Sequence, residues 1–191
     1  MMKQNNRAAF PLLKAKGVRM LILDVDGVMT DGSIIMDNGG EEWKAFNVRD
    51  GHGIKMLQRA GIQLAILTGR TSGVVASRAR DLGIEHVIQG SLKKSEGLNV
   101  LLEQAGLEAS DCAFMGDDIV DLPPMRRCRL GFAPRDAHVS VLAVADWAAD
   151  CDGGRGAVRQ VIEGLILAND AWQTVVEAPY GVTPADCGWN V

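Results

Sequence analysis

Residues Leu21–Val28 read LILDVDGV, an apolar run that ends in two carboxylates and a glycine. The stretch Val18–Leu23 is short and rich in branched apolar residues, which predicts a buried β-strand. Because successive side chains of a strand alternate between faces, Asp24 and Asp26 should point the same way just beyond its end. Gly27 allows a sharp turn there. Two neighbouring carboxylates repel each other unless a metal ion or a proton lies between them, so this pattern predicts a chemically active site.

The Asp-x-Asp-Gly pattern has ordinary interpretations as well. It occurs in turns where an aspartate side chain accepts a backbone N–H and the glycine is left-handed, and in calcium-binding loops. A short motif of this kind does not separate these interpretations by itself. The order of elements along the rest of the chain distinguishes the catalytic interpretation from the ordinary ones.

Apolar runs and helical patterns alternate along the sequence. The expected strands are Val18–Leu23, Ile62–Leu67, Ile84–Ile88, Cys112–Met115, Leu130–Ala133 and Asp146–Ala148. The expected helices are one N-capped by Asp50 and ending near Gly61, then Thr71–Leu82, Lys94–Ala105, a helix from Asp136, and Gly156–Ala168. Within Ser33–Phe46, the pair Asn38-Gly39 between two apolar or alternating runs predicts a β-hairpin inserted after the first strand.

This alternation favours an α/β fold with right-handed βαβ units, a three-layer Rossmann-like parallel sheet with helices on both faces. Ligands of such sheets bind at the carboxyl ends of the strands. The residues that fall at predicted strand ends are Asp24, Asp26, Thr68, Asp117 and Asp118. We therefore expect one crevice to collect them.

Length and composition set limits on the function. The chain has 191 residues and a net charge of −4, which predicts one main domain (residues 1–170) with a tail (residues 171–191) and argues against a general nucleic-acid binder. Neither a signal-peptide core nor a membrane-length apolar window is visible, and the four cysteines lack metal-finger spacing. A cytoplasmic protein with reduced thiols is expected. The tail lacks periodicity and is expected to be extended, although Trp172 and Trp189 within it suggest docking.

Together, the strand-end residues form a set suited to phosphoryl transfer. Asp24 would attack phosphorus and form an aspartyl-phosphate that water then hydrolyses, while Asp26 would protonate the leaving oxygen and later activate the water. Mg²⁺ prefers oxygen ligands, which Asp24, Asp117 and the backbone carbonyl of Asp26 could provide. Thr68 and the amides after it could bind phosphate oxygens, and Lys94 could neutralise the charge on the transferring group.

Each of these residues also has a purely structural interpretation when it is considered alone. Thr68-Gly69 could be an ordinary strand-to-helix turn, and Lys94 could be a solvated helix residue. The pair Asp117-Asp118 could cap a helix, where its negative charge is favoured by the helix dipole. Their joint occurrence at successive strand ends favours the catalytic interpretation.

The motifs resemble those of the haloacid dehalogenase superfamily. The four matching segments are Asp24-x-Asp26-Gly27, Leu67–Arg70, Lys94 and Gly116-Asp117-Asp118-x-x-Asp121. Two further stretches, Lys44–Gly51 and Gly153–Arg159, are similar to the small capless members that form the 3-deoxy-D-manno-octulosonate 8-phosphate phosphatase family. The resemblance runs from about Val18 to Ala168.

This resemblance implies a Mg²⁺-dependent phosphatase of a sugar-acid phosphate in lipopolysaccharide biosynthesis. It also implies a homotetramer in which hairpins pack together and a neighbouring subunit closes each active site in place of a cap domain. Ile34, Ile35 and Trp43 make this hairpin apolar enough for an interface. The substrate contacts implied by the resemblance are Asp26, Asn47, Val48, Arg49, Asp50, Gly51, Lys55, Arg70, Arg78 and Lys94.

Some of these assignments have alternatives. Arg78 could be a surface helix charge, and Lys55 stands where close relatives often have arginine, which loses bidentate geometry toward a carboxylate. Relatives bring the segment around Gly153–Gly156 onto a neighbour, so Arg155 or Arg159 could reach substrate in trans, although a simple helix-entry loop is the alternative. A phosphatase of nine-carbon keto-sugar-acid 9-phosphates and a catalytically silent oligomerising relative are the competing functions.

Overall fold

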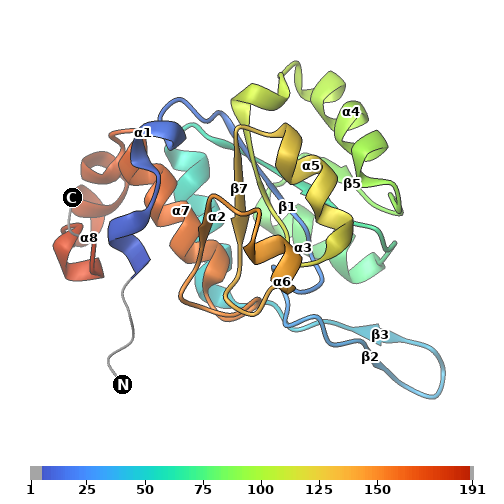
Figure 1. Cartoon of the computed structure of the whole chain (residues 1–191). Coiled ribbons are helices and arrows are strands. Elements are labelled where there is room, and N and C mark those ends of the chain that lie inside the picture. The colour runs from blue at the N-terminus through green and yellow to red at the C-terminus, as the bar shows by residue number, and fades with distance from the viewer. Residues whose placement is uncertain (1–5, 190–191) are drawn as a thin grey trace.

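The computed structural model of the chain describes residues 6–189 and contains a six-stranded parallel sheet with helices on both faces (Figure 1). The strand order is β5-β4-β1-β6-β7-β8, and every neighbouring pair is parallel. The strands are β1 (Met20–Leu23), β4 (Gln63–Leu67), β5 (His86–Ile88), β6 (Cys112–Met115), β7 (Leu130–Ala133) and β8 (Trp147–Ala148). The predicted three-layer α/β fold is confirmed.

Most α-helices of the described residues alternate with the strands, while α1 precedes β1 and α8 lies near the C-terminus. They are α1 (Leu12–Ala15), α2 (Val48–Arg59), α3 (Gly73–Leu82), α4 (Lys94–Ala105), α5 (Leu122–Arg127), α6 (Val139–Leu142), α7 (Ala157–Ala168) and α8 (Ala178–Tyr180). Across residues 6–189, no helix combines the length and the apolar character needed to cross a membrane.

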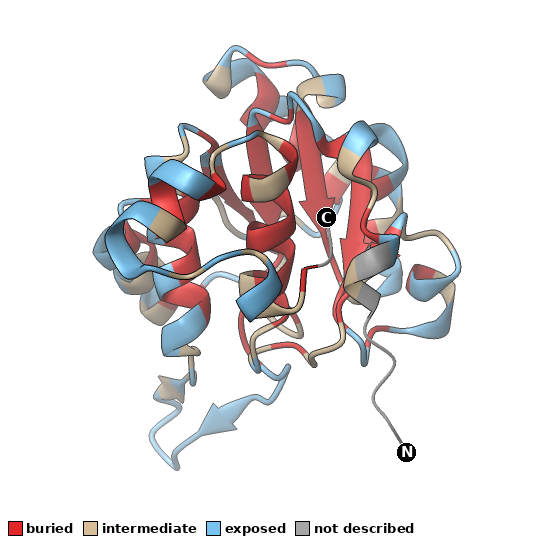
Figure 2. Ribbon diagram, turned by 90° about the vertical axis from the view of Figure 1, so that its left-hand side faces the viewer, coloured by how far each residue is buried: buried red, intermediate tan, exposed pale blue. Residues whose placement is uncertain are grey.

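The alternation of side chains along the strands creates two hydrophobic layers. In β1, Leu21 and Leu23 point into the layer that contains α2, α3 and α7, whereas Met20 and Ile22 point into the layer that contains α4, α5 and α6. All four side chains are fully buried, and Figure 2 shows the central strands as the most continuously buried part of the molecule. A strand buried on both faces explains the uninterrupted apolar run in the sequence.

The helix boundaries agree closely with the sequence signals, with one correction. Gly83 and Gly106 end α3 and α4 in the left-handed conformation, as predicted from their positions after the last apolar residue. The N-cap of α2 is Asn47 and not Asp50, because the Asn47 side chain accepts the backbone N–H of Arg49. Asp50 lies inside the helix instead, where its carboxylate accepts the backbone N–H of Arg159 at the start of α7.

The predicted hairpin is present as the antiparallel pair β2 (Ile35–Met36) and β3 (Glu42–Trp43), which projects away from the body of the molecule (Figure 1). Its turn is closed by Asp37, whose carboxylate accepts the backbone N–H groups of Gly39 and Glu41 at 2.8 Å. Both strands carry large apolar side chains that remain about half exposed.

The expectation of an extended tail is wrong. Residues 173–177 form a π-helical turn, α8 follows, and a 3₁₀ turn spans Ala185–Cys187. The expectation that the tail tryptophans dock is confirmed, because Trp172 and Trp189 are buried in the layer of α2 and α7. The Trp189 ring packs on Phe10, and its Nε1 donates to the Glu163 carboxylate at 3.0 Å. The tail sequence lacks periodicity because the tail packs on the core through isolated side chains such as Trp172 and Trp189. The placement of a domain boundary at residue 170 stays a prediction.

Truncating Trp189 should therefore destabilise the fold. We expect Trp189→Ala to lower the free energy of unfolding by about 3–5 kcal/mol, because a fully buried aromatic side chain leaves a cavity. Trp189→Phe should cost about 1–2 kcal/mol, since it keeps most of the ring contacts but leaves Glu163 Oε2 without its donor. Leu13→Ala, at a side chain that is 95% exposed, is the surface control. Urea denaturation of the three variants checks this order, and equal midpoints for Trp189→Ala and Leu13→Ala would contradict it.

Candidate active site

The carboxyl ends of β1, β4 and β6 surround a pocket of about 280 Å³. Because β1 lies between β4 and β6, the segments that follow these three strands meet at the same rim of the sheet. The residues that line the pocket are Asp24, Asp26, Gly32, Thr68, Gly69, Arg70, Ser91, Leu92, Lys94, Asp117, Asp118 and Val120. The structure therefore brings together every strand-end residue singled out from the sequence, and it adds Lys94 from the first turn of α4.

Lys94 is the centre of the charged groups in this pocket. Its Nζ lies 2.9 Å from Asp24 Oδ2 and 2.5 Å from Asp121 Oδ1, and its side chain is 2% exposed. Burial alone would lower the pKa of Lys94, but the adjacent carboxylates of Asp24 and Asp121 raise it above its usual value. Lys94 is therefore a buried cation held between two carboxylates and not the solvated helix residue of the alternative interpretation.

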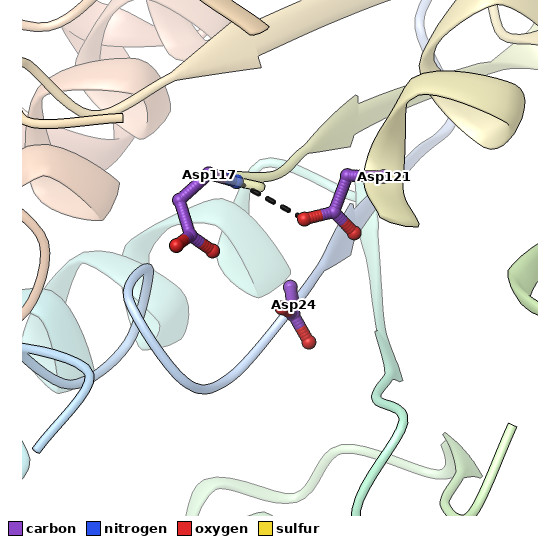
Figure 3. A group of neighbouring side chains, drawn as sticks. All are labelled: Asp24, Asp117 and Asp121. Atoms are coloured by element: carbon purple, nitrogen blue, oxygen red, sulfur yellow. Dashed lines mark hydrogen bonds between the residues drawn. The ribbon is translucent and has the colours of Figure 1, made fainter. Parts of the chain in front are cut away.

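Asp121 shapes the loop that follows β6. Its Oδ2 accepts the backbone N–H groups of Asp117 and Asp118, at 3.1 and 3.2 Å, while Oδ1 binds Lys94. Figure 3 shows Asp24, Asp117 and Asp121 grouped at the ends of two neighbouring strands, with the bond from the Asp117 backbone drawn. Both Asp121 oxygens thus have donors, and this residue acts as the support of the loop.

Asp24 and Asp117 differ from Asp121 because each has an oxygen with no donor. Asp24 Oδ1 and Asp117 Oδ1 are buried and accept no hydrogen bond from the described residues. Burial, together with the neighbouring acids, raises the pKa of Asp117 to about 8, and burial is the main cause that raises the pKa of Asp24 to about 6.

These features fit a divalent cation. Oxygen atoms of Asp24, Asp117 and Asp121 lie within 4.8 Å of one another. Three ionised carboxylates and the Lys94 ammonium sum to two negative charges, which is the charge that Mg²⁺ would cancel. Both Asp121 oxygens already accept hydrogen bonds, whereas Asp24 and Asp117 each have a buried oxygen with no donor, so we expect these two side chains to be the ligands, as the sequence predicts.

Gly27 allows Asp117 to approach the Asp24 loop this closely. Its φ of +88° belongs to the left-handed region that favours glycine. A Cβ atom at this position would also lie 2.1 Å from Asp117 Oδ2, which no side chain can tolerate. The glycine of the Asp-x-Asp-Gly motif is thus required for the turn and for the proximity of the two acids.

Asp26 faces a different set of charges. Lys44, whose side chain is 1% exposed, forms an ion pair with Asp26 and lies 3.4 Å from Glu42. Arg70 joins the same group, with Nε 3.7 Å from Asp26 Oδ2 and a guanidinium nitrogen 2.8 Å from Glu42 Oε1. Sequence reasoning assigned no role to Lys44, Glu42 or Asp121. The alternation of side chains along β3 and the residue after it could have predicted that Glu42 and Lys44 lie on one face and contact the same neighbours.

The other expected substrate residues lie outside this pocket in the single chain. Asn47, Val48, Arg49, Asp50 and Gly51 form the N-cap and first turn of α2, where Val48 is 80% exposed. Asn47 donates to the Gly154 carbonyl at 3.3 Å, so this turn lies beside the glycine-rich segment that precedes α7.

Four more basic residues named from the sequence also lie away from the strand-end acids. Lys55 donates to the Leu82 carbonyl at the end of α3, at 2.6 Å, and Arg78 lies over the Phe46 ring and against Gly51. Arg155 and Arg159 line a second pocket together with Arg49. Their assignment as substrate contacts stays a prediction.

Comparisons with known proteins agree with this geometry. The family model described as haloacid dehalogenase-like hydrolase matches residues 41–129. The chain is 46% identical over 157 residues to the 3-deoxy-D-manno-octulosonate 8-phosphate phosphatase KdsC of Escherichia coli (strain K12), covering 82% of this chain and 84% of that protein.

Two solved structures are similar over most of the chain. The 3-deoxy-D-manno-octulosonate 8-phosphate phosphatase of Yersinia pestis is 44% identical with a TM-score of 0.83, over 85% of this chain and 88% of that one. The enzyme of the same name from Moraxella catarrhalis, solved with magnesium, phosphate and KDO, is 39% identical with a TM-score of 0.85, over 92% and 99% of the two chains.

The fold and the strand-end acids define a hydrolase of the haloacid dehalogenase-like class. The chain belongs to this family, and the relatives that match most of its length include several 3-deoxy-D-manno-octulosonate 8-phosphate phosphatases.

The raised carboxyl pKa values predict a pH-dependent effect of Mg²⁺ on stability. Without metal, the folded protein holds protons on Asp117 and Asp24 that the unfolded chain releases near pH 4. These two groups therefore favour folding at low pH. Their contribution to stability is lost as the pH rises through about 6 for Asp24 and about 8 for Asp117. Since Mg²⁺ displaces a proton, its apparent affinity should rise about tenfold from pH 6 to pH 7.

Thermal denaturation with Mg²⁺ or EDTA across this pH range provides the measurement. The increase in melting temperature caused by Mg²⁺ should be larger at pH 8 than at pH 6, and Asp117→Asn should remove most of it. Asp81→Asn, an exposed aspartate on α3, is the matched control and should respond as the wild type does. A Mg²⁺ effect that is independent of pH would contradict the assignment.

Proposed function

We propose that this protein is a Mg²⁺-dependent phosphatase that hydrolyses 3-deoxy-D-manno-octulosonate 8-phosphate to the free sugar acid and phosphate, in lipopolysaccharide biosynthesis. The observation that carries the proposal is the arrangement of Asp24 and Asp117, each with a buried unpaired carboxylate oxygen, in one pocket with Lys94. The 46% identity to the Escherichia coli phosphatase supports the choice of substrate.

Asp24 is the proposed nucleophile. Lys94 holds one of its oxygens at 2.9 Å, which fixes the plane of the carboxylate at the mouth of the pocket. Attack of Asp24 on phosphorus would release the sugar alkoxide and leave an aspartyl-phosphate, which water hydrolyses in the second step. The Lys94 ammonium would at the same time neutralise charge on the transferring phosphoryl group.

Asp26 is the proposed acid and base. It would donate a proton to the leaving sugar oxygen and then accept one from the water that attacks the aspartyl-phosphate. Thr68 lies directly after β4, and its side chain with the following backbone N–H groups would bind phosphate oxygens.

Asp24, Asp117 and the backbone carbonyl of Asp26 would hold Mg²⁺. The ion, when bound, would shield the negative charge of the phosphate from the carboxylate nucleophile and polarise the P–O bonds. The Moraxella catarrhalis relative was solved with magnesium and phosphate, which supports the choice of this ion.

The basic residues outside the pocket fit an oligomeric site. The exposed apolar side chains of the hairpin (Ile34, Ile35, Met36 and Trp43) are suited to contact other subunits, and we propose a homotetramer. The basic and backbone groups of Asn47, Val48, Arg49, Asp50, Gly51, Lys55 and Arg78, together with Asp26, Arg70 and Lys94, would then contact the sugar acid. A cytoplasmic location is part of the proposal, and the free thiols of Cys112, Cys128 and Cys187 agree with it.

Replacement of the nucleophile tests the reaction. We expect Asp24→Asn to lower kcat at least about a thousandfold, because an amide cannot form the acyl-phosphate. The fold should be kept, since asparagine has nearly the same volume. Phosphate release from the sugar-acid phosphate and from an aryl phosphate, with Mg²⁺ or EDTA, is the measurement, and Asp81→Asn is again the control. Near-normal kcat in Asp24→Asn would exclude Asp24 as the nucleophile, and no release by the wild type would favour a silent relative.

A comparison of substrate lengths tests the specificity. The eight-carbon substrate should have a kcat/KM at least about tenfold above that of the nine-carbon keto-sugar-acid 9-phosphate, because a mispositioned phosphate loses transition-state contacts. Steady-state kinetics on both compounds with the same enzyme sample provides the ratio. A ratio near one or below would assign the enzyme to the nine-carbon class.

A further inference from the structure

The hairpin projects from the body of the molecule (Figure 1), yet the side chains of Glu42 and Lys44, on its second strand and just after it, contact active-site charges. Along β3 and the residue after it, the side chains of Glu42 and Lys44 are 16% and 1% exposed, whereas Trp43 between them is 58% exposed. This alternation places the two charged side chains on the inner face of the strand and the tryptophan on the outer face.

Both inner residues bind charged groups from the loops that follow β1 and β4. Lys44 Nζ contacts Asp26 Oδ1 and lies 3.4 Å from Glu42 Oε1, so one ammonium group bridges two carboxylates. Glu42 Oε1 also accepts from Arg70 at 2.8 Å. The result is a chain of alternating charges in which the hairpin contributes two members and the pocket contributes Asp26 and Arg70.

We propose that Lys44 and Glu42 are positioning residues for the phosphatase reaction: Lys44 orients Asp26 toward the leaving group, and Glu42 orients Arg70 toward the anionic substrate. The inference rests on the proposed function. A buried lysine loses about 2 kcal/mol of side-chain entropy and its hydration, so a charge-to-charge contact must offset that cost. The described contacts of its Nζ go to Asp26 and Glu42, and Asp26 is the group whose direction affects the chemistry.

The two positions should affect different kinetic constants. Without the ammonium of Lys44, the carboxylates of Asp26 and Glu42 would repel each other and Asp26 would turn away from its present direction. Because Asp26 acts on bonds that change in the transition state, the loss should fall on kcat. Loss of Glu42 would free Arg70, a substrate contact in the proposed function, so the loss should fall on KM.

Steady-state kinetics of Lys44→Met, Lys44→Arg and Glu42→Ala with the sugar-acid phosphate tests the inference. Lys44→Met should lower kcat at least about tenfold with KM changed less than about threefold, and Glu42→Ala should raise KM at least about fivefold with kcat changed less than about threefold. Lys44→Arg keeps the charge and should retain several times the kcat of Lys44→Met. The matched control is Lys16→Met, which breaks an exposed ion pair with Asp170 before β1 and should leave both constants unchanged.

Melting temperature and its increase with Mg²⁺ are measured on every variant. Kinetics as described, with a Mg²⁺ response like that of the wild type, would support the inference. Wild-type kcat in Lys44→Met, equal kcat in Lys44→Met and Lys44→Arg, or parallel losses in all constants together with the Mg²⁺ response would overturn it. If Lys44→Met does not fold, the kinetics of Lys44→Arg and Glu42→Ala still test the inference. A wild-type KM in Glu42→Ala would contradict the role of Glu42. An inactive wild type would instead contradict the proposed function.

Discussion

The contact of the Lys94 ammonium with Asp24 and Asp121 is the interaction on which the arrangement of the site depends. Burying a lysine and two carboxylates is costly unless they bind one another closely, and here the distances are 2.9 and 2.5 Å. Lys94 belongs to α4, Asp24 follows β1, and Asp121 follows β6, so the contact joins three segments that are distant in sequence. When the neighbouring Asp117 is ionised, it adds a negative charge that no described cation balances, which makes the pocket suited to a divalent ion.

The order of strands explains why this contact is possible. With β1 between β4 and β6, the loops that carry Asp24, Thr68 and Asp117 are next to one another, although they are separated by dozens of residues along the chain. The strands β1, β6 and β7 are buried on both faces and cannot carry charge. Polar chemistry is therefore confined to the strand ends, where the backbone leaves the sheet and Gly27 allows the loops to approach closely.

Two surface elements, the hairpin and the C-terminal segment, are each attached to the body of the molecule through one buried charged side chain. The hairpin reaches the site through Lys44, and the C-terminal segment is tied to α7 through Glu163, which accepts from Trp189 and from Arg159. The backbone of Arg159 in turn donates to Asp50 in the first turn of α2. The hairpin is thus tied to the pocket by an ion pair, and the C-terminal segment is tied to α7 and α2 by hydrogen bonds and an ion pair.

The sequence by itself determined the strands of the sheet, the helices other than α1, α5 and α8, the acids at the strand ends, and the family. These are local properties: apolar runs such as Val18–Leu23 predict strands, a glycine such as Gly106 ends a helix, and a parallel sheet collects its strand ends at one rim. Tertiary structure decided that Lys44 binds Asp26 and that Trp189 returns to the core, because each contact joins residues whose separation in sequence carries no periodic signal. A buried lysine and a surface lysine cannot be distinguished in a sequence, because only the fold decides whether a carboxylate lies next to the ammonium group.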